Sequence, residues 1–190
     1  SKYDLGDDAR DWRVATAQAD VKASGPNKKR ICSILYRPFD IRFTYYTGNS
    51  RGFYASPCRK VMNNMVAGNN RALAMSRSVE IGRFEHVFCT NGMIGHHSVS
   101  LKEVNYLCPL WLESPKDSPR RLLAEDNERQ PNLTTSFLGA FVATLSMEKI
   151  DARGLPIGIA PEDFFNYIYA VLYSPGYRSR YADYLKIDFP

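Results

Sequence analysis

The chain has 190 residues, of which 44% are hydrophobic and 13% aromatic, so it can fill a hydrophobic core and is not disordered overall. Its 25 basic and 20 acidic residues leave a net charge of +5. Residues 1–29 contain no apolar stretch as long as a signal peptide or a membrane span requires. This length is typical of one domain, and we expect a piece of a larger cytoplasmic protein.

The first part of the chain predicts a helix followed by two strands. Residues 7–20 have apolar side chains near helical spacing, behind aspartates that can cap the helix start. Residues 24–27 contain Gly and Pro and break the helix. Residues 30–36 have the composition of a strand. Pro38 marks a bend, because it cannot donate to a sheet, and the strand resumes at 41–46.

Strict alternation in residues 41–46 predicts which side chains face the core. The face expected to be buried consists of Ile41, Phe43 and Tyr45, and the outward face consists of Arg42, Thr44 and Tyr46. Arg37 and Asp40 flank the bend and are expected to pair with each other. The turn-forming segment 47–52 follows and carries Arg51 between two glycines.

The rest of the chain predicts a short helix, three strands and a helical end. Residues 56–68 form the short helix, with Ser56 as the N-cap and Gly68 at the C-terminal end. The further elements are strands at 70–78, 84–90 and 103–112, and helices at 133–149, 161–173 and 177–186. Between them, residues 113–131 are charged and hold three prolines, which is typical of a loop insertion.

This order of elements predicts an α+β fold, in which a mixed or antiparallel sheet carries an inserted helix and a helical C-terminal cap. We expect one domain over residues 1–190. Its predicted parts are an N-terminal helix and linker at 1–29, a basic sheet region at 30–112, the loop insertion at 113–131 and the helical cap at 132–190.

The positive charge is concentrated in the middle of the chain. Residues 30–110 carry ten basic and four acidic side chains, a net charge of +6, whereas residues 111–190 have a net charge of −2. Eight of the ten cations are arginines, which bind phosphates and guanine edges and stack on planar groups. This charge favours a polyanionic partner. An ordinary basic surface is the alternative that charge alone leaves open.

Catalytic and metal-binding patterns are largely missing. The chain lacks GxSxG, GxxxxGK[ST], HExxH and GxGxxG, and it lacks the closely spaced carboxylates of a metal-dependent nuclease. Zinc could use His86, Cys89, His96 and His97, which lie within twelve residues. Residues three apart in a strand point to opposite faces, so we expect no metal. The two adjacent histidines are expected to bind an anion or a base edge, or to have no role.

Several strings resemble the C-terminal region of single-chain restriction-modification enzymes of the type ISP and type IIG groups. They are YRPFDIRFTYYTGNSRGF (36–53), SPCRKVMNNM (56–65), FEHVFCTNGMIGHHSVS (84–100), YLCPLWL (106–112) and PEDFFNYIYAVLYSPGYRSRYADYLKIDFP (161–190). The last string is the most specific. The resemblance covers most of the chain from about residue 12 and is weak across 113–131. In those enzymes a nuclease, sometimes a translocase, and an adenine methyltransferase precede a target recognition domain.

The resemblance implies that the chain recognises a specific sequence in double-stranded DNA and adjoins an upstream methyltransferase domain. S-adenosylmethionine and Mg would belong to the upstream domains, so we expect no cofactor and no catalytic residue in this chain. The alternative is a structural coupling domain that docks the methyltransferase and the nuclease or translocase together without reading bases.

Cations and small polar side chains between residues 37 and 102 are the candidates for DNA contact. Phosphates accept hydrogen bonds from cations and hydroxyls, whereas bases are read by Arg, Asn and Gln. The residues predicted to face DNA are Arg42, Arg51, Arg59, Lys60, Arg77, His96, His97, Ser98 and Lys102. Tyr46, on the outward face of its strand, is a further candidate.

Overall fold

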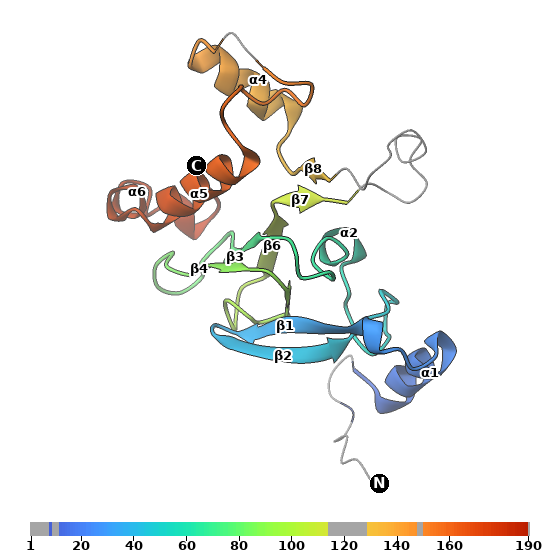
Figure 1. Cartoon of the computed structure of the whole chain (residues 1–190). Helices are drawn as coiled ribbons and strands as arrows, with labels where there is room; N and C mark the ends of the chain where they lie inside the picture. Colours follow the sequence, from blue (N-terminus) through green and yellow to red (C-terminus); the bar gives the residue numbers. More distant parts are fainter. Residues whose placement is uncertain (1–7, 9–11, 114–128, 148–149, 190) are drawn as a thin grey trace.

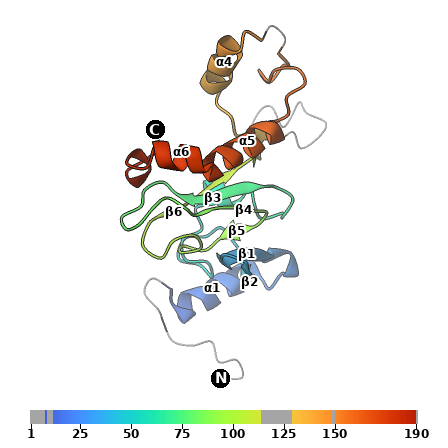
Figure 2. The ribbon, with the colours of Figure 1, turned by 90° about the vertical axis from the view of Figure 1, so that its left-hand side faces the viewer.

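The computed structural model describes residue 8 and residues 12–113, 129–147 and 150–189. Figures 1 and 2 show helix α1 (Val14–Ser24) at one end, small sheets in the middle and the C-terminal helices at the other end. The predicted α+β fold is confirmed. Within the described ranges, no helix has the length and apolar character needed to cross a membrane.

The first sheet is a hairpin with a short third strand. Strand β1 (Ile31–Arg37) pairs antiparallel with β2 (Asp40–Tyr45) and parallel with β5 (Met93–Ile94), in the order β2-β1-β5. The 3-10 helix η1 (Lys28–Arg30) leads from α1 into β1. Both strands predicted on either side of Pro38 are therefore present, and β2 lies at the edge of its sheet.

The second sheet is antiparallel and has β3 (Ala72–Ser76) at its centre, between β4 (Val87–Thr90) and β6 (Asn105–Pro109). A two-stranded ribbon of β7 (Trp111–Leu112) and β8 (Gln130–Pro131) follows. The predicted loop insertion at 113–131 thus ends in a strand, and its residues 114–128 lie outside the described residues.

Every residue of β3 is buried, because the strand separates two hydrophobic clusters. Its small residues Ala72 and Ala74 face the first cluster, which also contains Leu35, Met62, Met65, Met93 and Leu107. Its larger residues Leu73 and Met75 face the second cluster, with Phe165, Leu172 and Leu185. The two-residue period of a strand therefore sorts small and large side chains onto opposite faces.

The C-terminal part is helical, as predicted. Its elements are α4 (Thr135–Thr144), α5 (Pro161–Tyr173), α6 (Pro175–Arg180) and η2 (Tyr184–Lys186). Helix α5 matches its predicted range, and the Asp163 carboxylate accepts a hydrogen bond from the Ala160 N–H at 2.8 Å at its start. The helix predicted at 133–149 is shorter, with residues 148–149 outside the described residues.

Two predicted helices begin or end differently in the structure. Helix α1 begins at Val14, and most of the predicted start at residues 7–11 lies outside the described residues. Helix α2 covers Arg59–Met62 instead of residues 56–68, and its N-cap is Cys58. The Asn64 side-chain amide donates to the carbonyls of the preceding turn at 2.9 and 3.0 Å. Such side-chain bonds compete with helical hydrogen bonds and end the helix early.

The predicted orientation of β2 is wrong. Ile41 and Phe43 are 62% and 76% exposed, whereas Tyr46 is 6% exposed and belongs to the first cluster. The Tyr46 hydroxyl donates to the Asn63 side-chain oxygen at 2.9 Å, so this ring is not available to a partner. No residue of β2 itself is buried, because β2 is an edge strand, and the first aromatic ring to enter the core is that of Tyr46, directly after the strand.

Candidate nucleic-acid interface

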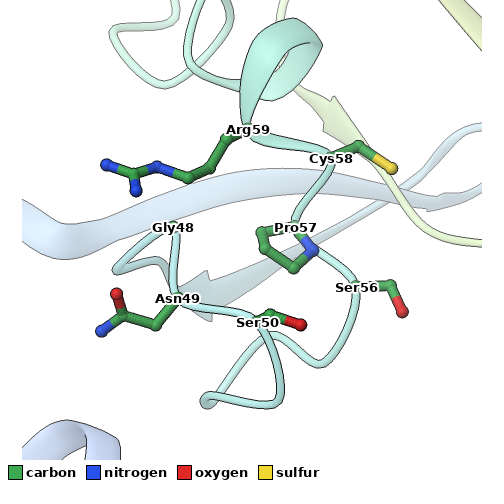
Figure 3. A pocket seen from close by; sticks show the side chains of 7 residues that line it. All are labelled: Gly48, Asn49, Ser50, Ser56, Pro57, Cys58 and Arg59. Atoms are coloured by element: carbon green, nitrogen blue, oxygen red, sulfur yellow. The ribbon is translucent and has the colours of Figure 1, made fainter.

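The loop at 47–58 connects β2 to α2 and borders an open cavity of about 500 Å³ (Figure 3). The cavity is lined by Gly48, Asn49, Ser50, Ser56, Pro57, Cys58 and Arg59. In Figure 3 the side chains of Asn49 and Arg59 lie on one side of the loop, and those of Ser56 and Cys58 lie on the other. Hydroxyl, amide and guanidinium donors of this kind suit a phosphate oxygen.

Asp20 of α1 fixes the shape of this loop. Its carboxylate is buried and accepts hydrogen bonds from the Thr47 hydroxyl at 2.8 Å, the Asn49 amide at 2.8 Å and the Phe53 backbone N–H at 2.9 Å. Burial raises the pKa of the Asp20 carboxyl, but these hydrogen bonds and the charge of Arg30 lower it to a net value below the usual 3.8. The carboxylate is therefore ionised at neutral pH and holds the loop in place.

Gly52 lies so close to Asp20 that a larger residue would disturb this arrangement. A Cβ atom at Gly52 would lie 2.3 Å from an Asp20 carboxylate oxygen and 2.8 Å from its carboxyl carbon. We therefore expect Gly52→Ala to lower the free energy of unfolding by about 1–3 kcal/mol, measured by urea denaturation. Gly139→Ala is the matched control, because a Cβ there meets nothing within 4 Å and alanine favours the helix. Equal losses in both variants would contradict the expectation.

Arg51 lies at the exposed turn of the loop. Its backbone adopts the left-handed conformation at φ 56°, its N–H donates to the Ala55 carbonyl at 2.9 Å, and the Gly52 N–H donates to the Asn49 carbonyl at 3.2 Å. A left-handed arginine is unfavourable unless the surrounding structure imposes it. The turn therefore fixes the backbone at Arg51 and leaves its side chain exposed to solvent.

Three of the predicted residues, Arg51, Arg59 and Lys60, lie in or next to this loop. All three are exposed, and none of them forms an ion pair in the part of the chain that the structure describes. The Arg59 side chain lies close to the backbone of Gly48. A Cβ atom at position 48 would lie 3.1 Å from the Arg59 Nε atom, so a glycine leaves room for this arginine. We call the 47–60 segment with these cations the basic loop.

The structure adds cations that the sequence reasoning missed. The basic run Lys28, Lys29 and Arg30 forms η1, and the Arg30 carbonyl accepts a hydrogen bond from the Tyr46 N–H at 2.8 Å, directly before the basic loop. The charge of Arg30 also contributes to lowering the pKa of Asp20, after the hydrogen bonds to its carboxylate. The run of three basic residues was visible in the sequence, but its position beside residues 46–53 was not.

Two other predicted residues are exposed but already paired. Arg42 forms a two-pronged ion pair with Asp40, at 2.8 Å for the shortest contact, and its guanidinium lies 3.8 Å from the centre of the Tyr36 ring. The predicted pairing of the Arg37 and Asp40 side chains is therefore wrong, because the Asp40 carboxylate forms its ion pair with Arg42. Arg77 pairs in the same way with Asp188, and its Nε lies 3.0 Å from a carboxylate oxygen. Both cations are partly neutralised.

The His96–His97 segment lies at the other end of the hairpin. The Arg37 guanidinium donates to the His97 carbonyl at 3.0 Å, and this contact places the segment beside the end of β1. His96 is exposed, whereas the Nδ1 atom of His97 is buried and has no hydrogen-bond partner among the residues that the structure describes. Ser98 is 1% exposed, and its hydroxyl donates to the Leu35 and Gly95 carbonyls. We therefore exclude Ser98 from the candidate interface.

Lys102 lies apart from the basic loop. It is exposed and lines a second cavity of about 390 Å³, whose other charged or titratable lining residues are Arg83, Glu85, His86 and Glu103. Among the described residues, no three His, Cys, Asp or Glu side chains are grouped so that they could hold a metal ion. The ring of His86 stacks on Phe88 instead, with 6.3 Å between the ring centres. The predicted residues thus form several separate groups.

Solved structures with a similar fold contain DNA. The cryoEM structure of a DrdV–DNA complex is 26% identical, with a TM-score of 0.61 over 90% of this chain and 15% of that chain. A nuclease-deletion mutant of the Type ISP restriction-modification enzyme LlaGI, in complex with a DNA substrate mimic, is 18% identical, with a TM-score of 0.51 over 86% of this chain. At this identity the second likeness shows the fold alone.

The chain spans only 15% and 12% of the lengths of these two proteins. No curated protein matches the chain. The model of one protein family, the Type ISP C-terminal specificity domain, matches residues 1–190, the full length of the sequence. On this match, and in agreement with the two similar folds, the chain belongs to the family of Type ISP C-terminal specificity domains.

Proposed function

We propose that the chain is the sequence-specific recognition module for double-stranded DNA in a restriction-modification enzyme. In this proposal it positions the target for an adenine methyltransferase and an endonuclease elsewhere in a longer cytoplasmic chain. The module itself uses no cofactor, and S-adenosylmethionine and Mg serve the other domains. The observation that carries the proposal is the basic loop of this specificity domain. Its exposed cations form no ion pair among the described residues, and one of them, Arg59, lines a polar cavity.

The geometry of the basic loop suits a duplex backbone. Asp20 and the left-handed turn at Arg51 fix the loop before any partner binds, so little conformational freedom is lost on binding. Arg59 lines the cavity and Lys60 follows it in α2, and η1 adds a second group of cations. Phosphate contacts of this kind set the register of a protein on DNA, and base contacts nearby then read the sequence.

Selection from a pool of random duplexes tests this function. We expect the chain to enrich one short sequence and to bind it with an affinity that falls steeply as salt increases, because phosphate contacts release counterions. Salt-dependent binding without enrichment would show DNA contact without base reading. An absence of salt-dependent binding, with a cooperatively folded chain, would contradict the proposal.

Exposed apolar side chains support the alternative of a coupling domain. Helix α4 contains no charged residue, and Phe137, Leu145 and Ile157 in or near it are 42%, 55% and 64% exposed. Tyr167 on α5 is 69% exposed. Contiguous apolar surface often marks a protein interface. Exchanging residues 37–102 with those of a related enzyme separates the two functions, because a coupling domain would leave the methylated sequence unchanged.

A further inference from the structure

The tip of the β1–β2 hairpin exposes one aromatic ring almost completely. Phe39 lies between the two strands, at the end of the hairpin opposite the basic loop (Figure 1). Its side chain is 94% exposed, and its backbone adopts φ 65°, in the left-handed region that residues with a Cβ rarely occupy. We propose that Phe39 stacks on a base of bound DNA as a wedge at a distorted base step. This inference rests on the proposed function.

The surrounding contacts hold the tip rigidly. Asp40 and Arg42 form their two-pronged ion pair directly after Phe39. Arg42 and Arg37 lie 3.8 and 4.4 Å from the centre of the Tyr36 ring. The Arg37 guanidinium also ties the tip to the His97 carbonyl at 3.0 Å. An unfavourable backbone conformation persists only where such contacts impose it, and it is often found at binding sites.

The neighbours of Phe39 favour a base over a protein surface. Its ring contacts Phe88 edge to face, with 6.2 Å between the ring centres, and Phe88 stacks on His86. Aromatic rings interleaved with arginines are typical of sites that stack nucleic-acid bases. The other exposed apolar residues of the hairpin, Ile41 and Phe43, follow in the edge strand β2. An apolar side chain at a projecting tip, as Phe39 is, can enter a duplex at a base step and unstack it, whereas Ile41 and Phe43 lie in the strand behind the tip.

The distance between the hairpin tip and the basic loop suits one duplex. The hairpin separates them by the length of β1, seven residues, which corresponds to about 20 Å. This equals about six base-pair steps of B-DNA. A duplex lying along the hairpin can therefore contact the basic loop with its phosphates while Phe39 reaches a base step.

Phe39→Gly is the decisive variant. Glycine relieves the left-handed backbone at this position, so the fold is retained while the ring is removed. We expect the affinity for the selected duplex to fall about tenfold, the size of a lost base–aromatic stack. The salt dependence is expected to stay unchanged, because no charge is removed. Phe39→Trp should keep the affinity within about threefold, because its ring also stacks.

A fluorescent base locates the wedge. 2-aminopurine is placed at each position of the duplex in turn. Binding of the unaltered chain should change the 2-aminopurine fluorescence at one base step. Phe39→Trp should give the same change, and Phe39→Gly should give none. Phe43→Ala is the matched control, because it removes an exposed phenylalanine from the same hairpin. If Phe39→Gly binds the duplex and changes its fluorescence as the unaltered chain does, the proposal that Phe39 stacks on a base is wrong. The exposed ring would then be assigned to a protein contact. If the unaltered chain shows no salt-dependent DNA binding, the proposed function fails together with it.

Discussion

Replacing Arg51, Arg59 and Lys60 together by glutamine is expected to weaken duplex binding by roughly 500-fold at 0.1 M salt. Each cation that neutralises a phosphate contributes a slope of about 0.9 in the plot of log affinity against log salt. Three lost contacts should therefore flatten this slope by about 2.7. The three side chains are exposed and unpaired among the described residues, so their removal should leave the fold intact. Fluorescence anisotropy at several salt concentrations gives both quantities.

The control removes the same charge from the other end of the molecule. Arg180 and Lys186 belong to α6 and η2, and Arg153 lies between α4 and α5. In Figure 1 these C-terminal helices are at the opposite end from α1, and replacing the three residues by glutamine changes the net charge equally. We expect this control to weaken binding by less than about fivefold, since charges beyond a Debye length are screened. The slope of log affinity against log salt should stay close to that of the unaltered chain. Equal losses in both triple variants would show that only the overall charge attracts DNA.

Asp20→Ala is expected to lower the free energy of unfolding by about 2–4 kcal/mol, because the variant removes a buried carboxylate that accepts three hydrogen bonds, two of them from half-buried residues. These donors are the Thr47 hydroxyl, the Asn49 amide and the Phe53 N–H. Urea denaturation at pH 7 measures the loss. The basic loop should also bind DNA more weakly at temperatures where the variant is still folded, because its shape is no longer imposed before binding.

The pH dependence of stability gives Asp20 a second, independent test. Its pKa in the folded chain lies below the usual 3.8, so the unfolded chain binds the proton more readily. The contribution of Asp20 is therefore complete above about pH 5 and is lost as the pH falls through 3.8 and below. Asp20→Asn keeps one oxygen as an acceptor and does not titrate. We expect it to lose less stability than Asp20→Ala at pH 7 and to approach the unaltered chain at low pH. If the free energies of unfolding of Asp20→Asn and the unaltered chain differed by the same amount at pH 7 and pH 3, Asp20 would not have a lowered pKa in the folded chain.

The sequence predicted those elements whose pattern is local. Helix α5 was placed correctly because Pro161 and two acidic residues mark its start and Ser174–Gly176 follow its end. Strands β1 and β2 were found because β-branched and aromatic residues surround the bend at Pro38. The buried face predicted for β2 was wrong, since alternation distinguishes two faces but does not show that an edge strand leaves both of them without a buried residue.

The arrangement of the candidate site was less predictable, because it depends on contacts between distant residues. Asp20 has no sequence signal that connects it to the loop 27–33 residues later, yet it organises that loop. The partner of Arg77 is Asp188, 111 residues away, so its partial neutralisation could not be foreseen. The Arg42–Asp40 pair is local and could have been weighed against Arg37–Asp40, but Arg37 instead donates to the His97 carbonyl, 60 residues away.

The central strand β3 limits which parts of the domain can vary between members of the family. Both faces of β3 are buried, so a substitution there disturbs two clusters at once and is poorly tolerated. The basic loop, the hairpin tip and the His96–His97 segment all lie on the side of β3 that carries the first sheet. Under the proposed function, new target sequences can therefore evolve by exchange of these surface segments while the central strand and the helices behind it keep their packing.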